Sequence, residues 1–306
     1  MRWLAALLFF AAAPHPVRLA HNPIVTPELS ASLGDNINGP SLIRVPSWIT
    51  KPLGKYYLYF AHHQGTYIRL AYADQLDGPW KIYEPGTLHI EEASICHNHV
   101  ASPDVHVDEA KRRILMYFHC PAQGVGKDIG DQKSVLATSP DGIRFTAKPV
   151  ALGAPYFRVF FWGGYYYSIA RAGVFSRSRD GESPFEEGPT LFNEDPNLTL
   201  RHAAVDLRGD RLAVYYSRIG DAPERILLSY IDLTPDWKRW KASPPVSVLA
   251  PEKQWEGADR PIEVSKMDLA PGDVRQLRDP AIFRENGQVY LLYTVAGESG
   301  IAIAKL

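Results

Sequence analysis

The sequence lacks the marks of several large protein classes. Only two of its 306 residues are cysteines, so it can form at most one disulfide. Apart from its first residues, it has no apolar run near the ~20 residues that cross a bilayer. Its formal net charge is −1, and it has no stripe of Lys and Arg with interleaved aromatic residues, which argues against a nucleic-acid partner. It also has no glycine-rich phosphate loop and no nucleophile elbow.

The N-terminus has the pattern of an export signal. Arg2 precedes an apolar run from Trp3 to Ala13 that is too short to span a membrane. We therefore predict a signal peptide and short linker over residues 1–20, and a secreted or periplasmic protein without a membrane span. The alternative is a misassigned start of translation. In an oxidising compartment Cys96 and Cys120 can form a disulfide, and the alternative is two buried free thiols.

The rest of the chain has an ordinary globular composition, with 45% hydrophobic and 22% charged residues. Its length suits either two small domains or one large all-β domain. The 16 Tyr, 12 Phe and 7 Trp residues favour strands and are also suited to stacking against sugar rings.

One short aromatic and β-branched segment recurs five times. The copies are residues 55–63, 112–120, 164–171, 211–218 and 288–295. Each copy follows a turn signal, and each turn follows another apolar strand, which is the pattern of a hairpin. The upstream strands are residues 39–46, 102–108, 154–160, 203–207 and 279–283. Four of these five open with a small or acidic residue followed by proline.

A third strand follows each hairpin, and in four units a turn then leads to an aromatic-led fourth strand, as in residues 234–240. Four antiparallel strands per repeat predict propeller blades. The last unit lacks its fourth strand, and residues 21–29 resemble the fourth strands elsewhere. We predict an all-β, five-bladed propeller over residues 21–306, a single domain closed by this N-terminal strand in the last blade. Two separate β-sandwiches do not explain five matching hairpins.

Blade geometry predicts one polar end of the central channel. The start of each first strand and the loop between second and third strands share this end, and the hairpin turns lie at the other. Histidine, amide, arginine and carboxylate groups converge on the first end, as a ligand pocket requires. The substrate-binding candidates are Asn38, His63, His97, His99, His119, Arg158, Arg171, His202, Arg218 and Arg278.

The DPAIF opening at residues 279–283, the aromatic second strands and the YAD…DGPW connection at residues 72–80 resemble the five-bladed propeller glycosidases of glycoside hydrolase family 43 and its relatives. The resemblance covers blades one to five. It implies hydrolysis of arabinosides, xylosides and related plant glycans. It also implies a carboxylate base, a carboxylic acid and a third carboxylate that tunes the acid, all at the channel mouth.

The chain departs from this family at the strand openings. Gly39-Pro40 stands where the family typically has Asp-Pro in blade one, and Ser102 and Ala154 precede the prolines of blades two and three. Only Asp279-Pro280 keeps the acidic residue. The family's base and acid therefore cannot be transferred by position.

Glycoside hydrolysis needs one group to protonate the leaving oxygen and another to activate water or to attack. Asp279 is the first catalytic candidate, because Arg278 beside it favours its ionised form; its alternative role is to cap the strand. Glu298, in a glycine-flanked turn, is the candidate acid, and its alternative is a solvated turn residue.

Three further carboxylates are weaker catalytic candidates. Glu224 and Asp35 are expected near the mouth, although such residues are more often surface charges. Asp104 shares a strand face with Ser102, so it points into the channel. It is either the carboxylate that tunes the acid or a partner of neighbouring strand amides.

The histidines have two readings. His97 and His99 share a face of an extended segment, and His63, His119 and His202 approach the same mouth. Three imidazoles can hold a metal ion, and one can act as a general acid near neutral pH. Because the spacing matches no fixed ligand motif, we predict no cofactor and hydrogen bonds to sugar hydroxyls, with a metal ion in the mouth as the alternative.

We therefore predict an exported, monomeric O-glycosyl hydrolase that cleaves a neutral or mildly acidic glycan at the channel mouth. The first alternative is a non-catalytic carbohydrate-binding propeller, which the missing Asp-Pro openings favour. The second is a His/Arg-dependent or metal-assisted lyase on a uronate-containing glycan. For this lyase, Arg158, Arg171, Arg201 and Arg218 would suit a substrate carboxylate.

Overall fold

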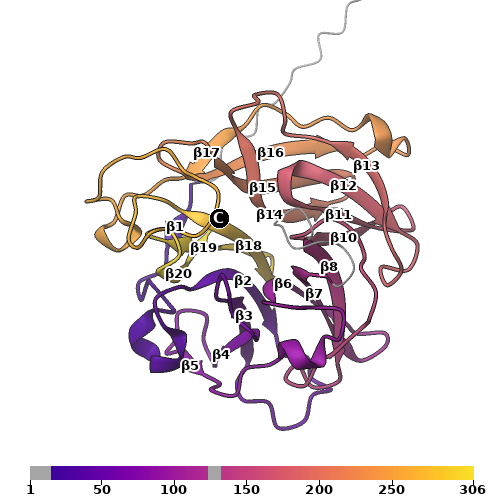
Figure 1. The fold of residues 1–306 in the computed structure, drawn as a ribbon, viewed down its shortest axis with the longest axis horizontal. Coiled ribbons are helices and arrows are strands. Elements are labelled where there is room, and N and C mark those ends of the chain that lie inside the picture. Colours follow the sequence, from indigo (N-terminus) through magenta and orange to yellow (C-terminus); the bar gives the residue numbers. More distant parts are fainter. Residues whose placement is uncertain (1–14, 123–131) are drawn as a thin grey trace, which may run out of the picture.

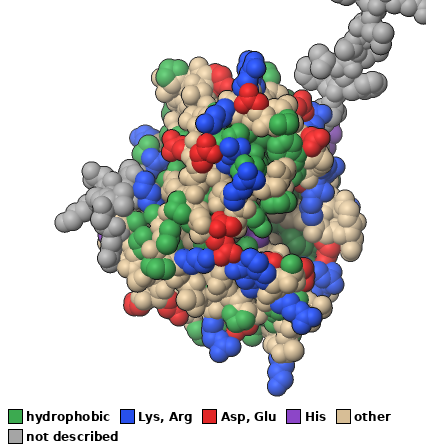
Figure 2. Space-filling model, turned by 90° about the vertical axis from the view of Figure 1, so that its right-hand side faces the viewer, with side chains coloured by type: hydrophobic (Ala, Val, Ile, Leu, Met, Phe, Trp, Pro, Cys, Tyr) green, Lys and Arg blue, Asp and Glu red, His purple; other side chains and the backbone are tan. Residues whose placement is uncertain are grey.

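The computed structural model describes residues 15–122 and 132–306, so residues 1–14 of the predicted export signal lie outside it. Five four-stranded antiparallel sheets surround a central axis (Figure 1), which confirms the predicted all-β, five-bladed propeller. Among the described residues, no helix has the length and apolar character needed to cross a membrane. On the side of the molecule in Figure 2, acidic and basic side chains are intermingled, in keeping with the small net charge.

The blades follow one another along the chain, each with its first strand at the centre. Blade one contains β2 (Asn38–Arg44), β3 (Tyr56–Ala61), β4 (Arg69–Ala73) and β5 (Lys81–Ile82). Blade two contains β6 (Ala101–Asp108), β7 (Arg113–Pro121), β8 (Gln132–Ser139) and β9 (Thr146–Ala147). Blade three contains β10 (Arg158–Trp162), β11 (Tyr165–Ile169), β12 (Val174–Ser178) and β13 (Glu186–Thr190). Blade four contains β14 (Thr199–Arg208), β15 (Arg211–Ile219), β16 (Ile226–Asp232) and β17 (Val246–Leu249).

Blade five closes the ring with an N-terminal strand. It contains β18 (Arg278–Glu285), β19 (Gln288–Val295), β20 (Gly300–Lys305) and β1 (Val17–Arg18), which pairs antiparallel with β20. Closure by the N-terminus is therefore confirmed, but its placement at residues 21–29 is wrong. Only Val25 of that segment bridges to β20, at Ile301. The prolines at 23 and 27 have no backbone N–H to donate, so the segment cannot form a continuous ladder.

The predicted fourth strand of blade four is also misplaced. Residues 234–240 form a turn and the short 3₁₀ helix η6 (Trp237–Arg239), and β17 follows at Val246–Leu249. Trp237 and Trp240 are buried against Tyr167, with ring centroids 5.6 Å and 4.9 Å away. Aromatic residues that suggest a strand therefore fill the core between blades three and four instead.

Short 3₁₀ helices occupy several connections. They are η1 (Pro27–Leu29), η2 (Ala31–Leu33), η3 (Ile90–Glu92), η5 (Arg171–Gly173), η6 (Trp237–Arg239) and η7 (Gln254–Glu256).

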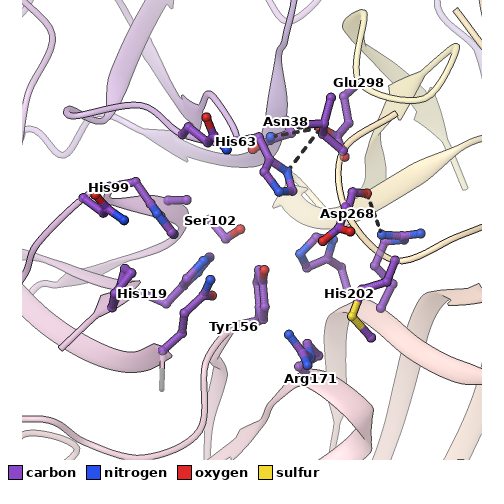
Figure 3. A pocket seen from close by; sticks show the side chains of 18 of the residues that line it. Asn38, His63, His99, Ser102, His119, Tyr156, Arg171, His202, Asp268 and Glu298 are labelled. Carbon is purple, nitrogen blue, oxygen red and sulfur yellow. Dashed lines mark hydrogen bonds and ion pairs between the residues drawn. The ribbon is translucent and has the colours of Figure 1, made fainter. Parts of the chain in front are cut away.

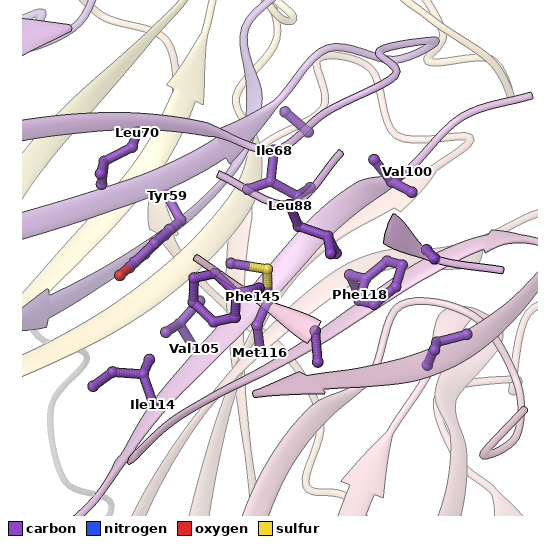
Figure 4. Packing of buried hydrophobic residues seen from close by; sticks show 14 of the residues in the cluster. Tyr59, Ile68, Leu70, Leu88, Val100, Val105, Ile114, Met116, Phe118 and Phe145 are labelled. Carbon is purple, nitrogen blue, oxygen red and sulfur yellow. The ribbon is translucent and has the colours of Figure 1, made fainter. Parts of the chain in front are cut away.

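Neighbouring blades pack through separate apolar cores. The core of blades one and two includes Tyr59, Leu70, Met116, Phe118 and Phe145, all buried (Figure 4). Burying one such side chain contributes roughly 1.5–3 kcal/mol. The first strands also contact one another around the channel, β2 with β6 and β18, and β14 with β10 and β18. The blades thus form a rigid frame for the residues at the ends of the channel.

Bulges shape the first strands at one end of the channel. The ladder register shifts at Gly39, Ser102 and Asp279, each of which precedes a proline and has positive φ, at 60°, 49° and 47°. A Cβ at Gly39 would lie 3.0 Å from Ser102 Cα, so glycine fits the close approach of blades one and two with the least crowding. Three of the four proline-containing openings seen in the sequence are therefore bulges that bring backbone and side chains together at one channel end, whereas Ala154-Pro155 precedes β10.

The structure joins Cys96 to Cys120 in a disulfide with a Cα–Cα distance of 5.6 Å, so the predicted pairing is confirmed. The bond fastens the segment before β6 to the end of β7. Because this segment continues into His97 and His99, the disulfide helps to position one wall of the channel mouth.

Candidate active site

A cavity of about 610 Å³ opens at the bulged end of the channel (Figure 3). This volume lies within the range of small-molecule sites, roughly 300–1,000 Å³. All five blades contribute to its walls, through the starts of first strands and the loops between second and third strands. The lining residues are Asn38, His63, Gln64, Asn98, His99, Ala101, Ser102, His119, Pro121, Gln132, Tyr156, Arg171, Arg201, His202, Ile219, Met267, Asp268, Leu269 and Glu298.

Glu298 is a nearly buried carboxylate on one wall of the cavity, in the turn between β19 and β20. Its oxygens accept hydrogen bonds from Asn36 Nδ2 at 2.6 Å, Asn38 Nδ2 at 3.4 Å and Arg278 Nη1 at 2.9 Å, and His63 Nδ1 lies 3.6 Å away. Burial raises the pKa of Glu298, but the hydrogen bond of His63 and the charge of Arg278 outweigh it and lower the pKa. Glu298 is therefore an ionised acceptor facing the cavity near neutral pH.

Asp279 reaches the cavity through His202. The Asp279 side chain is buried, its Oδ1 contacts His202 Nδ1, and its Oδ2 accepts the Gly39 N–H at 3.2 Å. Burial raises the pKa of Asp279, but the charges of His202 and Arg278 outweigh it and hold the pKa below its usual range. The imidazole of His202 itself lines the cavity, so the pair places an ionised carboxylate directly behind an imidazole in the cavity wall.

Two buried arginines, Arg201 and Arg278, form ion pairs behind this wall of the cavity. Glu224 is fully buried and pairs with Arg201 Nε at 2.9 Å and with Arg278 Nε at 3.2 Å. Both guanidinium groups also donate to the Asp268 carbonyl oxygen at 3.4 Å. These bonds hold the segment between β17 and β18 at the mouth. They leave Glu224 as an anchor for the arginines rather than a group in contact with the cavity.

The opposite wall is made of neutral rings. Figure 3 shows His99 and His119 across the cavity from His202 and Glu298. The centroid of Tyr156 lies 4.0 Å from that of His119 and 4.5 Å from that of His202. Burial, together with the charges of neighbouring histidines, lowers the pKa of His99 to about 4 and that of His119 well below its usual value. Both imidazoles are therefore neutral near pH 7 and can each donate and accept one hydrogen bond.

Several buried polar atoms of the wall have no hydrogen-bond partner among the described residues. They are His119 Nδ1, Gln132 Oε1 and His202 Nε2. Buried polar atoms normally have a partner, from protein or water. Their position in one cavity indicates a site for a polar ligand or for ordered water.

The structure brings ten of the fifteen predicted site residues to this region. Those that line the cavity are Asn38, His63, His99, His119, Arg171, His202 and Glu298. Those buried directly behind its wall are Glu224, Arg278 and Asp279.

The other five predicted residues do not line this cavity. Asp35 is exposed, and His97 is half-buried outside the lining. Arg218 pairs with Asp221 at 2.9 Å beside the mouth. Asp104 and Arg158 line a separate cavity of about 120 Å³ further along the channel.

Asp104 points into the channel, as its place in the strand predicts, but it lies away from the mouth cavity. The bulge at Ser102 turns that residue toward the mouth and lets the strand continue down the channel. Asp104 then accepts the Val159 N–H at 2.8 Å and pairs with His106 Nε2 at 2.8 Å. It binds a neighbouring strand amide, one of the two roles that its position predicted.

Sequence reasoning missed Tyr156, Gln132 and the segment Met267–Leu269 as individual site residues. Tyr156 had a usable signal, because it directly follows the Ala154-Pro155 opening of blade three. The segment 267–269 had none, since the misplaced fourth strand of blade four left it as a connection between blades.

Within residues 15–122 and 132–306, no group of three or more His, Cys, Asp or Glu side chains has an arrangement that could hold a metal ion.

Comparisons with known proteins identify one sequence relative and several solved structures with the same fold. No protein-family model matches the sequence. The chain is 38% identical over 322 residues to the uncharacterized protein R118 of Acanthamoeba polyphaga mimivirus, and the match covers 95% of this chain and 90% of that protein.

Solved structures share the fold. The family 43 enzyme GH43_1 from Xanthomonas citri, complexed with xylose, matches with a TM-score of 0.61 at 14% identity, over 89% of this chain and 88% of that chain. CoXyl43, a β-xylosidase/α-arabinofuranosidase from a compost metagenome, matches with a TM-score of 0.63 at 15% identity, over 95% of each chain. An N-acetylgalactosamine deacetylase from F. plautii matches with a TM-score of 0.58 at 11% identity, over 89% of this chain and 90% of that chain. The resemblance to a family-43 propeller is thus confirmed for the fold.

Proposed function

We propose, from the premise that this chain belongs to the same protein family as the uncharacterized protein R118 of the mimivirus, that it hydrolyses a glycosidic bond in the mouth cavity. One observation carries the proposal. Glu298 and the His202–Asp279 pair lie on the same side of a cavity large enough for a sugar, which places an ionised carboxylate near an imidazole that has a second ionised carboxylate in contact with it.

The cavity suits a carbohydrate. Its neutral histidines and its buried unpartnered polar atoms offer both donors and acceptors to hydroxyl groups. Tyr156, Met267 and Leu269 add apolar surface, which can cover the C–H face of a sugar ring. The xylose- and xylotriose-bound family 43 enzymes that share the fold support a saccharide as the ligand.

The chemistry assigns one role to each wall group. Ionised Glu298 takes a proton from water, and the water oxygen forms the new bond to the anomeric carbon. His202, protonated and backed by the Asp279 carboxylate, gives its proton to the leaving glycosidic oxygen as the old C–O bond breaks. The lowered pKa of Glu298 argues against the proton-donor role that its place in the sequence suggested. By this assignment Asp279 acts through His202 and is a positioning residue.

Export belongs to the same proposal. The disulfide Cys96–Cys120 supports a compartment outside the reducing cytosol, because disulfides persist where conditions are oxidising.

A carbohydrate-binding propeller without catalysis is the second candidate. Gly39 and Ser102 occupy the bulge positions that correspond to Asp279, so two of three related positions carry no carboxylate. This candidate predicts saccharide binding in the same cavity and no bond cleavage.

The test is product release from a panel of plant and bacterial glycans, followed by mass spectrometry. The expected result is cleavage by the wild type and a loss of at least about a hundredfold in both His202→Gln and Glu298→Gln. His21→Gln, a substitution of an exposed histidine outside the cavity, serves as the control and keeps full activity. Binding without cleavage of any glycan would favour the second candidate.

A further inference from the structure

We propose that the substrate carries a carboxylate, as a uronic acid residue does, and that Arg171 binds it. This inference rests on the proposed function, since it names the class of saccharide that the same cavity takes.

The arginines near the channel differ in what they bind. Arg201 is held by Glu224, and Arg218 pairs with the carboxylate three residues later. Arg158 donates to backbone carbonyls, including that of Ala203 at 3.0 Å, and lies at the smaller cavity. Arg171 lines the main cavity and makes no side-chain hydrogen bond or ion pair with another described residue. Of the two arginines that line the main cavity, Arg171 is therefore the one whose donors are not taken by another residue within 15–122 and 132–306.

The backbone fixes the place of Arg171. It begins the short helix η5 between β11 and β12, and its N–H donates to the Pro155 carbonyl at 3.1 Å. Gly173, two residues later, has φ of 80°, and a Cβ there would overlap the Leu191 carbonyl oxygen. The connection is a tight turn with little freedom, so Arg171 is held at the cavity wall.

Arg171 also lies in a suitable direction. Figure 3 shows it beside Tyr156, on the side of the cavity away from Glu298. A carboxylate bound to Arg171 is thus kept apart from the ionised Glu298, which would repel it. The neutral rings of His119 and Tyr156 near Arg171 add no competing negative charge.

A guanidinium matches a carboxylate in shape and charge. Its planar fork donates two parallel hydrogen bonds to the two oxygens, and such charge-assisted bonds are stronger than those to neutral hydroxyls. No carboxylate in the described part of the chain forms an ion pair with Arg171, so an acidic sugar would supply a counter-charge that a neutral sugar lacks.

The test compares acidic saccharides with carboxyl-reduced counterparts of the same linkage. The probes are trimers of galacturonic acid and of mannuronic acid, each beside its reduced neutral trimer, in titration calorimetry with the full chain. The wild type is expected to bind an acidic trimer about 10- to 100-fold more tightly than its neutral counterpart. Arg171→Gln should lose this preference and keep the affinity for the neutral trimer, and Arg171→Lys should keep part of the preference.

Arg239→Gln is the matched control, because Arg239 is an exposed arginine of η6 outside the cavity. It should behave as the wild type. Equal binding of acidic and neutral trimers by the wild type, or an equal loss for both in Arg171→Gln, would overturn the assignment. In that case cleavage of a neutral glycan that depends on His202 would leave the proposed hydrolysis standing. Binding of acidic trimers without cleavage of any glycan would instead overturn hydrolysis and support Arg171 as the carboxylate site.

Discussion

Replacing Asp279 with asparagine tests the link between the buried carboxylate and the imidazole. The substitution keeps the shape of the side chain and removes its charge. Asparagine also tolerates the positive φ of 47° at this position better than most residues do. Its side-chain oxygen can still accept the Gly39 N–H, which Asp279 accepts at 3.2 Å.

The magnitude follows from the contact between Asp279 and His202. An imidazolium and a carboxylate in contact attract by roughly 5 kcal/mol at an effective dielectric constant of about 20. Burial of the pair takes back part of this energy, which leaves about 3 kcal/mol for the contact between the carboxylate and the imidazole. Because each 1.4 kcal/mol is about tenfold, we expect activity at neutral pH to fall about a hundredfold or more.

The pH profile separates this role from a structural one. The substitution removes a buried negative charge in contact with the imidazole of His202, so the pH profile of Asp279→Asn should differ in shape from that of the wild type. A purely structural defect would reduce activity by the same factor at every pH.

A matched control comes from another buried carboxylate. Asp206 pairs with Arg284 outside the cavity and is 5% exposed. Asp206→Asn should lose stability and keep the activity of the remaining folded protein. The reasoning is refuted if folded Asp279→Asn retains activity within about threefold of the wild type. It is also refuted if the profile of this variant does not move.

Two further predictions concern stability. The hydrogen bond and charge of Arg113 lower the pKa of Glu182 to about 2, so this carboxylate stabilises the fold above its ordinary pKa of 4.5 and loses that effect as the pH falls toward 2. Glu182→Gln should thus lower the free energy of unfolding by about 1–2 kcal/mol at pH 7, with the difference from the wild type shrinking below pH 4.5 in urea titrations. An unchanged difference at pH 3 would contradict this. The disulfide Cys96–Cys120 spans 24 residues and restricts the unfolded chain, so the double substitution to alanine should lower the free energy of unfolding by ~3 kcal/mol. A loss well under ~1 kcal/mol would contradict the idea that the disulfide stabilises the fold in this way.

The blades were predictable because their signals are local. Turn residues and apolar strands recur within each unit, and residues far apart in the chain need not be considered. Where a local signal had a second physical explanation, the prediction failed. Trp237 and Trp240 resemble strand residues, but they pack into an inter-blade core. Residues 21–29 resemble a fourth strand, but their prolines leave only Val25 bridged to β20.

The candidate site was predictable at the level of the channel end, and less so at the level of roles. Asp279 was identified from its proline-linked opening, whereas its burial behind His202 depends on the packing of blades four and five. Glu224 and Asp268 show the same limit. Glu224 pairs with Arg201 of blade four and Arg278 of blade five. Asp268 is held at the mouth because its backbone carbonyl accepts hydrogen bonds from the side chains of the same two arginines.

The most direct test of hydrolysis in the mouth cavity is to run the reaction in heavy-oxygen water and to weigh the products. The wild type is incubated with the glycan panel, and mass spectrometry locates the new oxygen atom. Our account predicts one heavy oxygen at the anomeric carbon of the released end, and no product from His202→Gln on the same time scale. An unsaturated product that absorbs in the ultraviolet and carries no heavy oxygen, or no product from any glycan, would contradict it.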